Sequence, residues 1–177
     1  MAVFQSIRNF FTNLETAQPE VVVPAPPTTY SLHPLTLREI DTVLRLNNRC
    51  FRNGENYTRH TFSYLLNEPA TVSYQAVTAE GAMAGFAFVM MNPDGAGHLT
   101  TIGVAPEHRR RGLGLTLLQH LENSLRKKGA STIVLEVRVS NMAAQKLYNS
   151  AGYAVVQRLT SYYSNGEDGY LMVKALS

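Results

Sequence analysis

The chain has 177 residues, 45% of them hydrophobic and 16% charged, with a formal net charge of +3 at pH 7, which predicts one globular domain with a full core. The basic residues cluster in two short runs, 109–111 and 126–128, apart from the aromatic residues, and this argues against a nucleic-acid partner. No apolar run has membrane-spanning length and the only cysteine is Cys50, so we expect a cytoplasmic protein with no disulfide and no membrane partner.

We expect residues 1–29 to be an N-terminal extension and residues 30–177 to form the domain. The extension begins with apolar residues at helical spacing and continues into a proline-rich linker at 19–27. The apolar residues are Phe4, Ile7, Phe11 and Leu14. Arg8 is the one side-chain cation among them, which disfavours a membrane-surface anchor. We assign this extension no function, and the sequence leaves the oligomeric state open, a homodimer included.

Strand and helix patterns alternate along the domain and predict an α/β (α+β) fold. The predicted strands are Tyr30–Leu35, Thr71–Thr78, Ala84–Met91, His98–Val104, Thr132–Val139, Ala154–Tyr163 and Tyr170–Ala175. The predicted helices are Thr36–Cys50, which starts with a capping-box sequence, Arg59–Leu66, Gly112–Lys128 and Asn141–Gly152. Short links on either side of the helix at 112–128 predict a right-handed crossover between two parallel strands. The last two strands are expected to form a hairpin around Asn165-Gly166.

The most informative stretch is Val104–Gly114, where an apolar strand runs into three arginines and two closely spaced glycines before a helix. A glycine-rich turn at a helix N-terminus directs backbone N–H groups at one point, which is typical of a phosphate site. The arginines at 109–111 would add long-range attraction for a polyanion. The spacing fits neither the mononucleotide loop nor the dinucleotide fingerprint. An ordinary strand-to-helix turn with solvated arginines remains the alternative.

Arg109, Gly112 and Gly114 stand at the fixed positions of an [RQ]-x-x-G-x-[GA] pattern. This pattern, between a strand and a strongly periodic helix, resembles the signature of the GNAT superfamily of acyl-CoA-dependent N-acetyltransferases. The resemblance implies a mostly antiparallel sheet of about seven strands, flanked by about four helices. It also implies one parallel strand pair that separates at the site for acetyl-CoA.

A narrower resemblance, to the bacterial ribosomal-protein alanine N-acetyltransferases, covers roughly residues 30–177 and is strongest from Thr101 onward. The segments that carry it are Leu135–Asn141, Ala143-Ala144, Leu147-Tyr148, Gly152-Tyr153, Tyr162-Tyr163, Gly166–Asp168 and Leu171-Met172. Two departures stand out: Thr101 replaces a frequent Asn, and the loop at 52–60 shows no acceptor-site pattern. Both concern the acceptor more than the reaction.

The resemblance assigns roles to residues on both sides of the crossover. It implies that Ile102 and Val104 hold pantetheine through their backbone and that Asn141 contacts the cosubstrate. It implies Glu136 as the general base and Tyr148 as the general acid. The residues implied to hold the pyrophosphate are Arg109, Arg110, Arg111, Gly112, Leu113, Gly114 and Leu115.

The residue types suit these roles without deciding them. Glu136 is a carboxylate in an otherwise apolar strand, and Tyr148 lies on the inner stripe of the next helix. A carboxylate can take a proton from an amine, and a phenol can give one to a leaving thiolate. The alternatives are a half-exposed solvating Glu and an ordinary core Tyr. His98, at the start of the strand that enters the turn, is a reserve second base.

The acceptor is expected to be the α-amino group of a protein or peptide N-terminus. Freeing a lysine amine of its proton at neutral pH costs roughly 3 kcal/mol more than freeing an α-amine. Tyr162 and Tyr163 are candidates to line a groove for an extended peptide, although tyrosines on a sheet edge are also ordinary packing. A lysine, a small amine and a non-catalytic acyl-CoA sensor remain the alternatives. No metal is expected, because the five histidines have no ligand spacing with Cys50 or the carboxylates.

Overall fold

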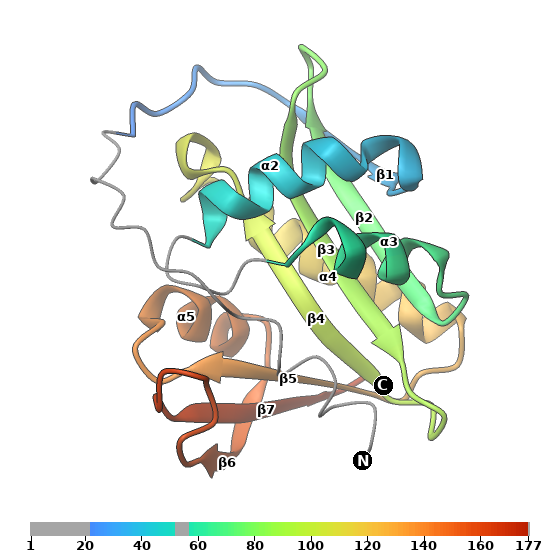
Figure 1. The fold of residues 1–177 in the computed structure, drawn as a ribbon, viewed down its shortest axis with the longest axis vertical. Helices are drawn as coiled ribbons and strands as arrows, with labels where there is room; N and C mark the ends of the chain where they lie inside the picture. Colours follow the sequence, from blue (N-terminus) through green and yellow to red (C-terminus); the bar gives the residue numbers. More distant parts are fainter. Residues whose placement is uncertain (1–21, 52–56, 177) are drawn as a thin grey trace.

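The computed structural model describes residues 22–51 and 57–176. The helix expected at residues 4–14 and the loop at 52–56 therefore lie outside the described residues. Figure 1 shows one twisted sheet with helices on both faces.

A seven-stranded sheet with the order β1-β2-β3-β4-β5-β7-β6 organises the molecule. Its strands are β1 Tyr30–Pro34, β2 Thr71–Thr78, β3 Met83–Met91, β4 Gly97–Val104, β5 Thr132–Arg138, β6 Ala154–Leu159 and β7 Gly169–Ala175. Every neighbouring pair is antiparallel except β4 and β5, which are parallel. These two strands pair only at 97–98 with 133–134 and then separate. The predicted fold class, including its one divergent parallel pair, is confirmed.

The helices lie on both faces of this sheet (Figure 1). They are η1 Leu37–Glu39, α2 Ile40–Cys50, α3 Arg59–Asn67, η2 Pro106–His108, α4 Leu113–Lys127 and α5 Met142–Ser150. The predicted capping box is present, with Thr36 and Glu39 exchanging side-chain and backbone hydrogen bonds. Helices α2 and α3 pack on one face of β3, and α4 packs on the other.

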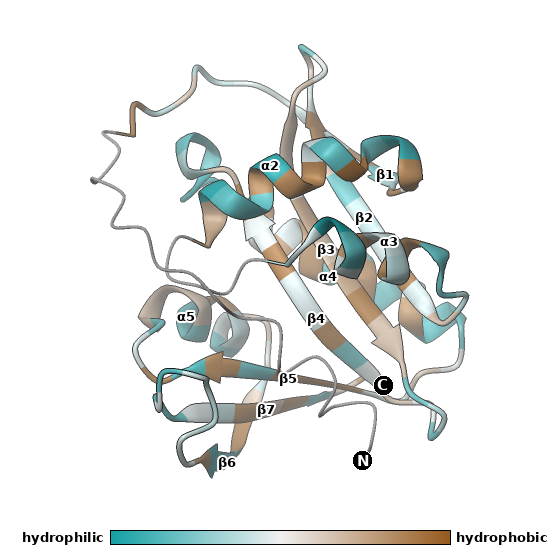
Figure 2. Cartoon of the chain, viewed as in Figure 1, coloured by the Kyte–Doolittle hydropathy of each residue, from teal (hydrophilic) through white to brown (hydrophobic). Residues whose placement is uncertain are grey.

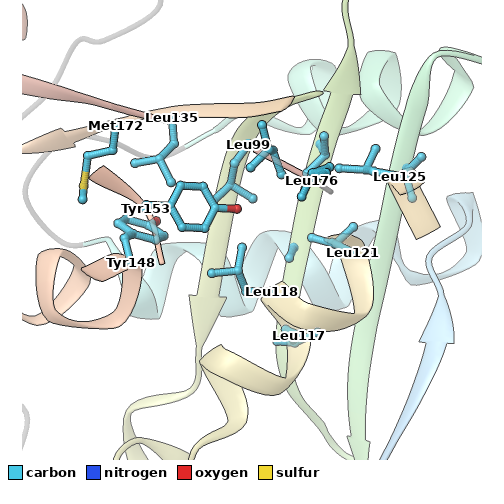
Figure 3. Close-up of a cluster of buried hydrophobic side chains, with 14 of the residues drawn as sticks. Leu99, Leu117, Leu118, Leu121, Leu125, Leu135, Tyr148, Tyr153, Met172 and Leu176 are labelled. Carbon is cyan, nitrogen blue, oxygen red and sulfur yellow. The ribbon is translucent and has the colours of Figure 1, made fainter. Parts of the chain in front are cut away.

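Strand β3 separates two hydrophobic clusters and is covered on both faces, as its nearly continuous apolar sequence predicts. Phe86 and Phe88 point toward α3, where both rings contact Phe62. Ala87 and Val89 belong to the other cluster, with the leucines of α4. Figure 2 shows the hydrophobic residues along β3. Figure 3 shows the α4 leucines 117, 118, 121 and 125 in this second cluster.

The predicted end of the strand Ala154–Tyr163 is wrong, because β6 ends at Leu159. Ser161 has a positive φ of 48° and its N–H donates to the Asp168 carboxylate at 2.8 Å, so the chain leaves the sheet there. Both Tyr162 and Tyr163 therefore lie in the β6–β7 connection. The predicted turn at Asn165-Gly166 is confirmed within this connection, since the Gly166 N–H donates to the Tyr163 carbonyl.

Candidate active site

A cavity of about 950 Å³ lies where β4 and β5 have separated. Its walls come from β4, the turn before α4, β5, one face of α5, and the β6–β7 connection. Most of the candidate site residues line this cavity, together with several neighbours. These lining residues include His98, Ile102, Val104, Arg109, Arg110, Gly112, Leu113, Gly114, Leu115, Glu136, Arg138, Asn141, Lys146, Tyr148, Tyr162 and Tyr163. Residues predicted from the turn, from β5 and from α5 are thus brought together.

The phosphate turn, residues 109–115, is open toward the cavity. Arg110 and Gly112 have positive φ values of 62° and 78°. A Cβ added to Gly112 would meet nothing within 4 Å, so no side chain fills the turn there. Within the described part of the chain, no acceptor takes a hydrogen bond from the backbone N–H groups of residues 110–115. Unpartnered N–H groups at the positive end of α4 make this turn a suitable site for phosphate oxygens.

The second glycine of the turn serves packing. A Cβ at Gly114 would come within 3.3 Å of the Leu147 side chain, so a glycine at this position lets α4 and α5 pack without displacing that side chain. Gly112 supplies the left-handed backbone, and Gly114 supplies the close approach. Glycine is therefore favoured at the two positions of the motif for different physical reasons.

The three consecutive arginines point to different surroundings. Arg109 lines the cavity and donates from Nε to the Val104 carbonyl at 3.1 Å. Arg110 also lines the cavity. The Arg111 guanidinium instead donates to the carbonyls of Ala25 and Pro26. The structure therefore separates three side chains that the sequence presents as one run.

Glu136 and His98 face each other across the gap between β5 and β4. The Glu136 Oε2 atom lies 2.6 Å from His98 Nε2. Alternation along β5 buries Ile133, Leu135 and Val137 in the core and leaves Glu136 on the cavity side. The two side chains are only 17% and 15% exposed, so Glu136 is not a solvating surface residue. The reserve base expected from the sequence is thus the direct partner of the main candidate.

Tyr148 projects from α5 into the core side of the cavity and is buried. Burial raises the pKa of its phenol above the ordinary value, so the hydroxyl is protonated at neutral pH. Its ring packs against Tyr153 with a centroid separation of 5.8 Å. The arrangement keeps a proton available on a fixed side chain.

Asn141 both begins α5 and lines the cavity. Its side-chain oxygen accepts from the Ala144 N–H at 3.1 Å, which is an ordinary N-cap. The cap fixes the orientation of the amide, and the described residues provide no acceptor for its N–H₂ group. That group is the part of Asn141 suited to a ligand carbonyl.

The sequence profile of the Acetyltransferase (GNAT) family matches residues 40–153. The chain belongs to this family. It is 31% identical to an N-alpha-acetyltransferase of Saccharolobus solfataricus over 158 residues, which cover 83% of the chain and 93% of that protein. It is 40% identical to the [ribosomal protein bS18]-alanine N-acetyltransferase of Escherichia coli K12 over 104 residues, 57% of the chain and 70% of that enzyme.

Solved structures agree with this assignment. The crystal structure of the ribosomal-protein-S18-alanine N-acetyltransferase from Escherichia coli superposes with a TM-score of 0.76 at 30% identity, over 84% of this chain and 95% of that one. The chain is therefore a GNAT acetyltransferase and an acyltransferase enzyme.

Aromatic side chains form the end of this GNAT cavity beyond Glu136. Tyr162 and Tyr163 meet edge to face at 5.1 Å, and the Arg138 guanidinium lies 3.9 Å from the centre of the Tyr163 ring. Tyr57, which the sequence analysis did not select, lines the same end and donates from its hydroxyl to the Thr100 carbonyl at 2.9 Å. Burial raises the pKa of the Tyr57 phenol, and the nearby Glu136 raises it further.

Lys146 is a second residue that the sequence analysis missed. It lines the cavity from α5 together with Ala143, Leu147 and Ser150. These four positions follow the i, i+3, i+4, i+7 spacing of one helix face, which was visible in the sequence. Among the described residues, no carboxylate lies within ion-pair distance of Lys146.

Two further features of the described residues bear on the kind of site. No group of three His, Cys, Asp or Glu side chains there is arranged to hold a metal ion. None of the helices in the described ranges is both long and apolar enough to cross a bilayer.

Proposed function

We propose that this enzyme transfers the acetyl group of acetyl-CoA to the α-amino group of a protein or peptide N-terminus, by direct attack in a ternary complex. The observation that carries the proposal is a single cavity lined both by the open phosphate turn and by the Glu136–His98 pair. An anionic carrier held at the turn would have its thioester end directed toward these two side chains.

The residues of the turn and of β4 fit acetyl-CoA. The free N–H groups of residues 110–115 suit its diphosphate, and Arg109 and Arg110 add positive charge beside it. Ile102 and Val104 lie on the edge of β4 that β5 has left, where a pantetheine amide can pair with the strand. Asn141 offers an amide at the opposite wall. Acetyl-CoA supplies an activated thioester carbonyl.

The proton transfers are assigned to two side chains that line the cavity. Glu136, paired with His98, accepts the proton of the incoming ammonium group, directly or through a water molecule. Tyr148, whose buried phenol is protonated, donates to the departing sulfur as the C–S bond breaks, and the second proton that the nitrogen loses on becoming an amide restores the phenol. The acceptor would enter past Tyr57, Tyr162 and Tyr163.

An α-amine is the preferred acceptor for three reasons. Its proton is removed more easily than that of a lysine at neutral pH. The aromatic end of the cavity suits an extended peptide backbone, and the relatives named above are N-alpha- and ribosomal-protein alanine acetyltransferases.

Since Cys50 is the only cysteine of the chain, the enzyme needs no oxidising compartment, and we propose that it acts in the cytoplasm.

The test is an acceptor panel with acetyl-CoA, read by thiol release and by mass spectrometry of the product. The panel contains a peptide with a free N-terminus and no lysine, the same peptide with a blocked N-terminus and one lysine, and a small polyamine. We expect acetylation of the first peptide only. Faster acetylation of the lysine or of the polyamine would contradict the assigned acceptor. Binding of acetyl-CoA without turnover on any acceptor would favour a sensor.

A further inference from the structure

The N-terminal arm, defined here as residues 22–29, lies against the phosphate turn on the side away from the cavity. The Ala25 N–H donates to the Glu107 carbonyl at 3.0 Å. In the opposite direction, the Arg111 guanidinium donates to the Ala25 carbonyl and, at 2.9 Å, to the Pro26 carbonyl. Figure 1 shows this segment in blue, leading into β1.

The arm is also fixed at its other end. The Thr28 hydroxyl donates to the Glu80 carboxylate at 3.1 Å and accepts from the Ala79 N–H at 3.3 Å, both in the β2–β3 turn. Just after the arm, the Tyr30 hydroxyl lies 3.0 Å from His108 Nδ1, and the two rings meet edge to face. The arm therefore connects the rim of the sheet with the turn.

These contacts hold the chain on both sides of Arg110, the residue of the turn with the least favourable backbone conformation. Glu107 and His108 precede Arg110, Arg111 follows it, and each of the three contacts the arm or Tyr30. Arg110 itself has a φ of 62°, which residues other than glycine adopt rarely and only where the surroundings impose it. The same φ contributes to the orientation of the N–H groups that face the cavity.

We propose that the arm is a positioning element for the phosphate turn, and that Arg111 is a positioning residue acting through the arm instead of through contact with the diphosphate. The proposal rests on the proposed use of acetyl-CoA. Three prolines, Pro24, Pro26 and Pro27, keep the arm extended before it docks, so little conformational entropy is lost when it does. The planar fork of Arg111 suits two adjacent carbonyl oxygens.

The test is a double-mutant cycle in the full-length chain. One change replaces residues 22–28 by a Gly-Ser sequence of equal length, and the other is Arg111→Met. Each alone should weaken CoA binding about fivefold, the size of a lost set of net hydrogen bonds. Together they should weaken it no further, because a flexible Gly-Ser arm no longer holds its backbone carbonyls beside residue 111 and the second change then removes nothing more. Calorimetry gives the Kd, and kcat at saturating acetyl-CoA should stay near that of the wild type.

Arg110→Met is the matched control, because this side chain lines the cavity and does not contact the arm. It should weaken CoA binding by the same factor in both arm backgrounds. Arg111→Lys, which keeps one donor to the arm, should bind CoA with intermediate affinity and provides a second variant if Arg111→Met unfolds.

Two results would overturn the proposal. An Arg111→Met effect that is equally large with and without the native arm would mean that Arg111 contacts the ligand itself. A Gly-Ser arm variant with wild-type affinity would mean that the arm does not position the turn. Failure of the wild type to bind CoA is a separate outcome, which would remove the proposed function together with this inference.

Discussion

Glu136 and His98 show how the site depends on the placement of single residues. His98 is the last residue of β4 opposite a β5 partner, and Glu136 lies two residues beyond the paired part of β5. Their side chains meet because the strands have just begun to separate, which leaves room for both and for a ligand. The contact of 2.6 Å joins the carboxylate and the imidazole in one hydrogen-bonded pair at the cavity.

Lys146 carries a prediction at the same scale. It faces the cavity from α5. The next residue, Leu147, lies beside Gly114 of the phosphate turn. We expect its ammonium group to contact the 3′-phosphate of CoA. Lys146→Met should raise the KM for acetyl-CoA roughly tenfold, equal to about 1.4 kcal/mol, and leave kcat unchanged.

The measurement compares acetyl-CoA with its 3′-dephospho form. The dephospho form should have the same KM with the wild type and with Lys146→Met, since the contact is absent in both. Lys127→Met is the matched control, as Lys127 is exposed at the end of α4 and outside the cavity wall. An equal rise of KM for both forms would place Lys146 at another part of the ligand.

The sequence predicts residues of this site where one local rule decides their position. Strand alternation places Glu136 on the face of β5 opposite Leu135, and helix periodicity places Tyr148 on the inner face of α5. The direction of Arg111 is different, because it depends on carbonyls 85 residues earlier in the chain. Periodicity carries no information about such a long-range partner. The pairing of His98 with Glu136 likewise depends on the register of β4 against β5.

The β6–β7 connection is an element that brings several functional side chains together. Glu167 accepts from the Ser140 N–H at 2.9 Å and from Arg138 at 2.7 Å. Arg138 in turn lies over the Tyr163 ring. These contacts join the connection to the end of β5 and to the start of α5, so Tyr162 and Tyr163 have a fixed place in the cavity wall.

The pH dependence of stability tests the contribution of the Glu167 contacts with Ser140 and Arg138. Hydrogen bonds from the hydroxyl and the backbone N–H of Ser140, followed by those from Arg138, lower the pKa of Glu167 to about 2. A carboxyl whose pKa is lower in the folded state stabilises the fold above its unfolded pKa, and the stabilisation is lost as the pH falls through the folded value. Glu167→Gln should therefore lower the free energy of unfolding at neutral pH.

The difference between wild type and Glu167→Gln should shrink from about pH 4.5 down to about pH 2. Denaturant unfolding at a series of pH values measures it. A difference that is constant across this range would show that the ionised form of Glu167 has no special role in the fold.

The end of β6 could not be predicted from the sequence, because it is set by the hydrogen bond from the Ser161 N–H to the Asp168 carboxylate within this connection.

At the scale of the whole molecule, the sheet consists of two parts that meet at the β4–β5 pair. The part with β1 to β4 leads into the turn at 109–115, and the part with β5 to β7 carries Glu136, Tyr162 and Tyr163. Few backbone hydrogen bonds join the two, so side chains must hold them. Helix α4 does so with its buried leucines and with Glu122, which accepts from Lys174 of β7 at 2.6 Å inside the core.

The resemblance predicted the fold class, with about seven strands and one divergent parallel pair, and the sequence pattern predicted the individual elements. The apolar run of β3 and the periodic leucines of α4 are strong local signals, and both elements are confirmed. The docking of the arm at 22–29 is not a local property, since its partners are Glu80, Glu107 and Arg111. Its prolines indicated an extended segment but not its place on the domain.

In the proposed reaction, the cavity delivers an acetyl thioester to an amine that Glu136 deprotonates. The most direct test is the pH dependence of kcat with a saturating peptide acceptor, compared between the wild type and Glu136→Gln. We predict that kcat falls about 10²- to 10³-fold and that the pH–rate profile changes shape, while the Kd for CoA stays within about twofold. A Glu136→Gln enzyme with the wild-type pH–rate profile and kcat would contradict the account.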